Sequence, residues 1–125
     1  MSNRGRILIA EDNEVNQRAV QAMLLELGFQ SDVRGTGKAA VEACLKGHYQ
    51  AVLMDGFMPE MDGFDAAREI RRRERRRRTP IIALTASARE KDRGLCFDAG
   101  MDDCLAKPVK LAVLSVVLER WISPE

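Results

Sequence analysis

Short apolar runs, each closed by polar or turn-forming residues, recur along the 125-residue chain. Runs of this length are typical of strands buried in a parallel sheet. We expect five such strands, at residues 6–10, 29–33, 51–54, 81–84 and 102–106, of which the second is only weakly apolar. The third run ends abruptly at Asp55, so this carboxylate stands where a buried strand stops.

Apolar residues at helical spacing fill the segments between these strands. The first segment begins at the favourable N-cap Asn13 and ends at Gly28, with apolar residues every fourth position between them. Further helices are expected around residues 39–44, from Asp62 into an arginine-rich run that stops before Thr79, and at residues 86–99 and 110–121. Five strand–helix alternations predict an α/β fold with a doubly wound parallel sheet.

Composition is consistent with a soluble globular protein, at 46% hydrophobic and 31% charged residues. A chain of this length is expected to form one domain over residues 1–125. The chain has neither a long apolar stretch nor the apolar core of a signal peptide, which predicts no membrane insertion. Cys44, Cys96 and Cys104 lack metal-ligand spacing and cannot all pair with one another, which favours reduced thiols and a cytoplasmic location.

Acid, hydroxyl and ammonium groups follow four of the predicted strands. Glu11 and Asp12 follow the first, Asp55 the third, Thr85 the fourth and Lys107 the fifth. Because parallel strands end at the same edge of a sheet, we expect these side chains to converge there. Three close carboxylates repel one another unless a cation lies among them, and a site of oxygen ligands without histidine suits Mg²⁺.

The run Arg71–Arg78 holds seven arginines and one glutamate, a formal charge of +6. The whole chain carries +1, so the remainder carries −5. Such a run is either a nucleic-acid patch or the solvated end of a helix, where cations suit the negative pole of the dipole. No aromatic residues for stacking are interleaved, so the helix-end interpretation is favoured and no DNA binding is expected.

Four motifs together resemble the receiver domain of two-component response regulators, and the wording is closest to receivers of hybrid sensor histidine kinases. They are ILIAEDN, VLMDGFMPEMDG, IIALTAS and AGMDDCLAKP, and the resemblance covers essentially the whole chain. It implies a flavodoxin-like (βα)5 fold with strand order 2-1-3-4-5. It also implies a domain that accepts a phosphoryl group from a phosphohistidine in a His-Asp phosphorelay. Such a domain catalyses its own phosphorylation and slow dephosphorylation, while a parent hybrid kinase would be a protein-histidine kinase.

The resemblance assigns a role to each acid at the sheet edge. Asp55 becomes the phosphoacceptor, and Asp12 becomes a direct ligand of Mg²⁺. Glu11 becomes the second acid, acting largely through water, and the backbone carbonyl of Phe57 completes the metal site. Because a carboxylate is a weak nucleophile, activation has to come from neutralising charge on the phosphoryl group.

The resemblance makes Thr85 and Lys107 the two groups that hold the phosphoryl oxygens. It also implies a cis peptide bond before Pro108. Cys104 departs from the family pattern, because this position usually carries a tyrosine or phenylalanine that swings inward on phosphorylation. We expect Cys104 to be a small buried residue, and we hypothesise that signalling here does not use the aromatic switch.

The expected partners are a histidine kinase, a histidine phosphotransfer protein, or both, docking on the first helix near residues such as Asn16 and Ala19. His48 is the only histidine and is expected at the surface, so the chain is not itself the phosphodonor module. The last helix has an apolar face of Leu111, Leu114, Leu118 and Trp121, with three valines around it. This excess of apolar surface is consistent with a weak homodimer through the last two helices, or with a broadly buried helix.

Two other functions fit the sequence less well. A phosphohydrolase of the haloacid dehalogenase type needs an Asp-x-Asp pair after the first strand, where this chain has Glu11-Asp12-Asn13. The alternative is a phosphorylation-independent protein-binding module that keeps the receiver fold and uses the arginine run as its contact surface.

Overall fold

Five parallel strands form one sheet in the order β2-β1-β3-β4-β5. The computed structural model describes residues 4–75, 77–86 and 90–122. The strands are β1 (Arg6–Ala10), β2 (Gln30–Arg34), β3 (Ala51–Asp55), β4 (Ile81–Thr85) and β5 (Asp103–Ala106). The register places Asp55 of β3 opposite Leu84 of β4, and Thr85 of β4 opposite Ala106 of β5. The predicted flavodoxin-like order is therefore confirmed.

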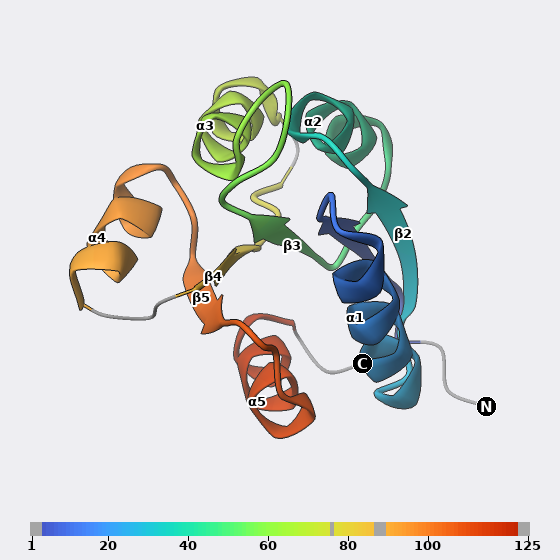
Figure 1. The fold of residues 1–125 in the computed structure, drawn as a ribbon. Coiled ribbons are helices and arrows are strands. Elements are labelled where there is room, and N and C mark those ends of the chain that lie inside the picture. The colour runs from blue at the N-terminus through green and yellow to red at the C-terminus, as the bar shows by residue number, and fades with distance from the viewer. Residues whose placement is uncertain (1–3, 76, 87–89, 123–125) are drawn as a thin grey trace.

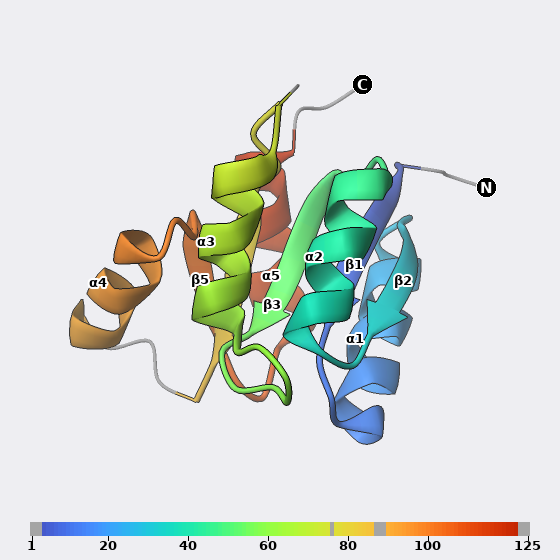
Figure 2. The same ribbon diagram turned by 90° about the horizontal axis from the view of Figure 1, so that it is seen from above.

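Helices cover both faces of the sheet, as Figures 1 and 2 show. They are α1 (Glu14–Glu26), α2 (Gly37–Lys46), α3 (Gly63–Arg73), α4 (Glu90–Asp98) and α5 (Leu111–Trp121). One core cluster joins the sheet to α1 and α5, and a second joins it to α2, α3 and Cys96 of α4. Every residue of β3 is buried, because this central strand is covered on both faces. No helix among the described residues is long and apolar enough to cross a membrane.

The predicted strands are all present, with shifts of one residue at some of their ends. The second strand begins at Gln30 rather than at Phe29. The reason is that the Phe29 amide donates to the carbonyl of Leu24 at the end of α1, while its side chain is buried in the core. The fourth helix is shorter than expected: it begins at Glu90, Ala86 lies outside it, and residues 87–89 lie outside the described part of the chain.

The interpretation of the arginine run as a helix end is right only for its first three residues. Helix α3 ends at Arg73, and Glu74 is already extended, with ψ of 144°. The backbone leaves the helix here because Arg71 binds Glu74 and the carbonyl oxygen of Thr79 at the same time. Arg75, Arg77 and Arg78 therefore lie between α3 and β4 and do not complement the α3 dipole.

Helix α5 buries part of its apolar surface. Leu114, Val117 and Leu118 are buried, whereas Val113 and Val116 remain exposed. Trp121 is partly exposed, and its indole N–H donates to the Asp103 carboxylate at 2.9 Å. The helix is therefore not broadly buried, because two of its valines stay at the surface. The other alternative, a weak homodimer through this helix, stays a prediction.

Candidate functional site

The predicted site residues stand where β1, β3, β4 and β5 end. Asp55 is the last residue of β3 and Thr85 the last of β4, while Glu11 and Lys107 directly follow β1 and β5. All strands run in the same direction, so their ends lie along one edge of the sheet. Glu11 is 1% exposed and Asp55 5% exposed, whereas Asp12 is exposed to solvent.

Three carboxylates gather at this edge. One oxygen atom from each of Glu11, Asp12 and Asp55 lies within 4.8 Å of the others. This spacing allows a single cation to contact all three groups. Such a set of hard oxygen donors without histidine or cysteine matches the ligand preference of Mg²⁺.

Lys107 brings a positive charge against two of these acids. Its Nζ lies 3.0 Å from Oδ2 of Asp55 and 3.1 Å from Oε2 of Glu11. Burial opposes the ammonium charge, but the two carboxylates outweigh it and raise the pKa of Lys107. The peptide bond between Lys107 and Pro108 is cis, as the resemblance implied.

The pKa values of Asp55 and Glu11 shift in opposite directions, although burial raises both. Burial raises the pKa of Asp55 above its usual range, and the neighbouring Glu11 adds to this effect, although Lys107 opposes it. Burial also disfavours the charged form of Glu11, but hydrogen bonds from the Asn16 amide group and the Asn13 backbone help to lower its pKa. Glu11 Oε2 is buried and forms no hydrogen bond of acceptable geometry within the described residues, although Lys107 lies 3.1 Å away. This under-satisfied oxygen faces the group of acids and leaves an acceptor for a further donor or cation.

The loop after Asp55 is held close to the end of β3. The Phe57 amide donates to Oδ1 of Asp55 at 3.2 Å, and the Gly63 amide donates to the Gly56 carbonyl at 3.0 Å. A Cβ atom on Gly63 would lie 2.1 Å from the Asp55 carbonyl oxygen, so only glycine permits this approach. The Phe57 side chain is 78% exposed and makes an edge contact with Phe64, with ring centroids 6.4 Å apart.

Two residues of α1 support Glu11, and sequence reasoning did not assign this role to them. Asn16 donates from its side chain to Oε1 of Glu11 at 3.2 Å, and Gln17 donates to the Glu11 carbonyl at 2.6 Å. From the sequence, Asn16 is expected only as a docking residue on the first helix. The available signal was the placement of two amide side chains in the first turns of the helix that follows the acids, where they face back toward the strand end.

Thr85 and Cys104 occupy the places expected of them. Thr85 is half-buried at the end of β4, and its carbonyl accepts from the Lys107 amide at 2.7 Å, which ties the two predicted phosphoryl-holding residues together through the backbone. Cys104 is buried in β5 within the cluster that also contains Cys96 and Met101. Cys104 is 7% exposed, which confirms the expectation of a small buried residue at the position that usually carries an aromatic side chain.

The parallel five-stranded sheet, with buried acids and a lysine at its carboxyl edge, places the protein among the open α/β domains whose sites lie at that edge. Residues 7–119 match the family model described as the response regulator receiver domain, and the chain belongs to this family. Among solved structures, it is similar to the receiver domain of sensor histidine kinase PA1611 from Pseudomonas aeruginosa, with 49% identity and a TM-score of 0.85. That match covers 93% of this chain and 95% of the other, and that structure has a magnesium ion coordinated in its active site cleft.

Two further relatives indicate the kinds of protein that carry such domains. The receiver domain of the Saccharomyces cerevisiae response regulator Ssk1, crystallised with the histidine phosphotransfer protein Ypd1, is 30% identical with a TM-score of 0.85, over 93% of this chain and 87% of that one. The aerobic respiration control sensor protein ArcB of Escherichia coli is 39% identical over 116 residues, which are 92% of this chain and 15% of ArcB. The chain thus spans only a small part of the hybrid kinases that it matches.

Proposed function

We propose that this domain accepts a phosphoryl group on Asp55 from a phosphohistidine donor in a His-Asp phosphorelay. The observation that carries the proposal is the contact of Lys107 with Asp55 and Glu11, at 3.0 and 3.1 Å, beside the exposed carboxylate of Asp12. A buried nucleophile, a positive charge and an acidic cation site are the groups that phosphoryl transfer requires. Family membership and the hybrid-kinase relatives support the same assignment.

The acidic group fits Mg²⁺. In this proposal Asp12 and Asp55 bind the ion directly, the backbone carbonyl of Phe57 completes the protein ligands, and Glu11 acts largely through water. The under-satisfied Oε2 of Glu11 and the close spacing of the three carboxylates are the features that fit a cation here. When bound, Mg²⁺ neutralises charge on a phosphoryl oxygen.

The side chains of the chain itself then perform the transfer. A carboxylate oxygen of Asp55 attacks phosphorus, a P–O bond forms as the P–N bond of the donor breaks, and the imidazole keeps the electron pair. Lys107 is already in contact with Asp55 and neutralises a second phosphoryl oxygen. Thr85 donates a hydrogen bond to a third oxygen, a contact that exists only in the phosphorylated state and therefore biases the loop after β4. Slow attack by water later releases phosphate.

The proposal is tested by incubating the protein with Mg²⁺ and acetyl phosphate and measuring its intact mass. We expect the mass to rise by one phosphoryl group, Asp55→Asn to abolish the increase, and removal of Mg²⁺ with EDTA to prevent it. Asp62→Asn is the matched control: Asp62 caps α3, and asparagine caps equally well, so the increase should persist. No increase in the parent protein would contradict the proposal and favour a phosphorylation-independent binding module.

We further infer that the partner is a histidine kinase or a histidine phosphotransfer protein that approaches over α1. Val15 of this helix is 75% exposed, and Asn16 and Ala19 are exposed beside Glu11. The complex of Ssk1 with Ypd1 supports this kind of partner.

We also propose that residues 1–125 act as one receiver domain in the cytoplasm, without DNA binding. We propose in addition that the exposed residues Phe97 and Val116 contribute to weak self-association through α4 and α5.

A further inference from the structure

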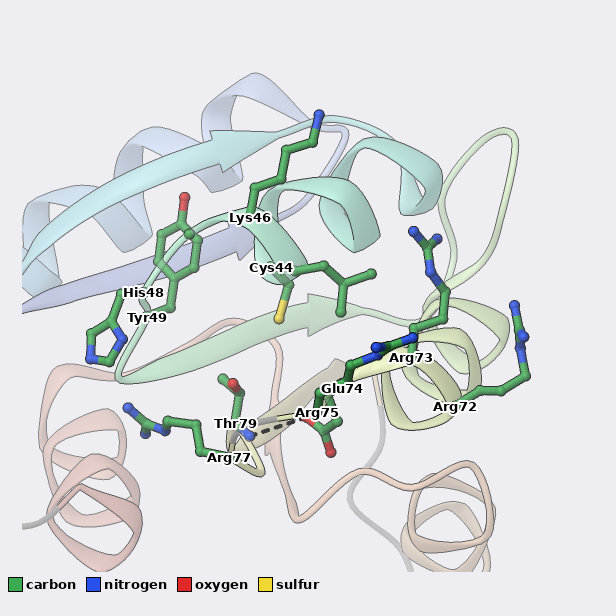
Figure 3. A pocket seen from close by; sticks show the side chains of 12 residues that line it. Cys44, Lys46, His48, Tyr49, Arg72, Arg73, Glu74, Arg75, Arg77 and Thr79 are labelled. Carbon is green, nitrogen blue, oxygen red and sulfur yellow. Dashed lines mark hydrogen bonds between the residues drawn. The ribbon is translucent and has the colours of Figure 1, made fainter.

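A hollow lies at the edge of the sheet opposite the acidic site, where β3 and β4 begin. It has a volume of about 980 Å³ and is bordered by the end of α2, by residues 48 and 49 before β3, and by residues 72–75, 77 and 79 at the end of α3 and between α3 and β4. Figure 3 shows His48 and Arg77 at one end and Arg72, Arg73 and Arg75 toward the other, with Cys44 between them. Its volume is in the range of small-molecule sites.

Two arginines of the run, Arg71 and Arg78, form ion pairs with Asp102. Arg71 is half-buried and binds Asp102 at 2.7 Å, Glu74 at 2.9 Å and the Gly100 carbonyl at 2.8 Å. Arg78 binds the other oxygen of Asp102 at 2.9 Å. Neither residue lines the hollow.

The cations that do line the hollow are poorly compensated. Among the described residues, five basic side chains border it, namely Lys46, Arg72, Arg73, Arg75 and Arg77, against the single acid Glu74. That acid already binds Arg71 and the Thr79 amide. Arg72 and Arg73 have surface ion pairs with Glu69 and Glu42, but Arg75, Arg77 and Lys46 have no ion pair among the residues that the structure describes. The hollow therefore carries an excess of positive charge.

The surroundings of these cations define the chemistry of a ligand. Guanidinium groups present paired N–H donors that match the oxygens of phosphate. The carboxyl-terminal ends of α2 and α3 add negative partial charge, which opposes anion binding, so an anion is held only where it contacts several of the basic side chains at once. The ring of Tyr49 is buried and its hydroxyl group is bound to Asp32 at 2.8 Å, which leaves no tyrosine face for stacking a base. A compact anion fits better than a nucleic acid strand.

We propose that this hollow binds a compact ligand with two or more adjacent phosphate groups, either a soluble polyphosphate or a lipid headgroup. The site is separate from Asp55 and does not depend on its phosphorylation. It gives a role in binding to Arg75 and Arg77, which line the hollow and form no ion pair among the described residues.

Inorganic tripolyphosphate, titrated calorimetrically in the absence of Mg²⁺, is the first probe. We expect it to bind the parent protein and the Asp55→Asn variant equally, and affinity to fall at least about tenfold in the double variant Arg75→Ala, Arg77→Ala. These loop arginines have no ion pair in the described structure, so their removal should leave the fold intact. The double variant Arg18→Ala, Arg68→Ala loses the same charge from exposed helix positions outside the hollow and should retain affinity.

The second probe distinguishes the two phosphate sources. Vesicles that contain phosphatidylinositol bisphosphate are compared with vesicles of phosphatidylcholine alone, and amide chemical shifts of Gly47, Tyr49 and Thr79 report where each probe binds. Selective vesicle binding indicates a headgroup, and binding of tripolyphosphate alone indicates a soluble ligand. The proposal is overturned if neither probe binds, if the control variant loses as much affinity, or if a single-stranded oligonucleotide binds more tightly than both.

Discussion

At the residue scale, the central feature is one ammonium group shared by two buried acids. Lys107 contacts Asp55 and Glu11, while Asn16 supports the other oxygen of Glu11. Because Asp55 is almost fully buried, its charge depends on this contact, and its pKa is raised despite it. The arrangement keeps a weak nucleophile beside the cation that later has to neutralise the transferred group.

Lys107→Met should therefore slow phosphorylation more than it disturbs the fold. Methionine keeps the length and the apolar stem but removes the positive charge, so we expect the rate of phosphorylation by acetyl phosphate to fall ~100-fold. Intact-mass measurements over time give this rate. Lys38→Met, at an exposed position of α2, removes the same charge and should leave the rate unchanged. Equal rates in the parent and Lys107→Met proteins would remove Lys107 from the mechanism.

At the element scale, Arg71 decides where α3 ends and how it joins β4 and β5. Its guanidinium group binds the Thr79 and Gly100 carbonyls and the carboxylates of Glu74 and Asp102. Asp102 in turn accepts from the Ile81 amide at 2.9 Å, at the first residue of β4. A half-buried charge network thus replaces further helical turns after Arg73.

Arg71→Ala should destabilise the protein strongly, whereas its neighbour Arg72→Ala should not. Removing Arg71 leaves Asp102 and two carbonyl groups short of donors, at a cost of about 3–5 kcal/mol in the free energy of unfolding. The Arg72 side chain is 69% exposed, so its loss should change stability by less than about 0.5 kcal/mol. Urea unfolding followed by circular dichroism measures both. Equal effects would show that the network around Arg71 does not stabilise the fold.

At the scale of the whole molecule, buried acids act on stability in opposite directions. Asp103 of β5 is 3% exposed and accepts from Trp121 and Arg120 of α5, at 2.9 and 2.6 Å. Burial alone would raise its pKa, but these hydrogen bonds outweigh burial and lower it. The ionised Asp103 carboxylate therefore holds α5 against the sheet and stabilises the fold. The raised pKa of Asp55 means that ionisation of this residue destabilises the fold.

The lowered pKa of Asp103 predicts a loss of stability in acid. Its contribution is fully present above the pKa of the unfolded chain, about 3.8, and disappears as the pH falls through that value toward the folded pKa. Asp103→Asn should lower stability at pH 7 by about 1–3 kcal/mol and flatten the decline in acid. Thermal unfolding between pH 3 and pH 7 provides the measurement. A decline as steep in Asp103→Asn as in the parent protein would refute this role of Asp103.

For Asp55 the sign is reversed, because its pKa is raised in the folded protein. Asp55→Asn should therefore raise the melting temperature at neutral pH.

Much of the fold was predictable, because strands and their ends are local features of the sequence. The apolar runs located all five strands, and the polar residues that end them located Glu11, Asp55, Thr85 and Lys107 along one edge. The parallel direction of the strands follows from the helix between each pair, so convergence of these residues required no knowledge of long-range contacts. The pattern therefore predicted both the sheet and the composition of the site.

The sequence alone thus determined the strands, their order of alternation and which chemical groups stand at the strand ends, because these depend on spacing along the chain. Tertiary structure decided what depends on contacts between distant residues. It tied the last turn of α3 to the segment before β5 through the bonds of Arg71 to Gly100 and Asp102, some 30 residues away. It also brought Asn16 against Glu11, and it separated Arg71 and Arg78, which pair with Asp102, from Arg75 and Arg77, which line the hollow without an ion pair among the described residues. Periodicity reports which face of an element is buried, but not which charged side chain meets which partner across the fold.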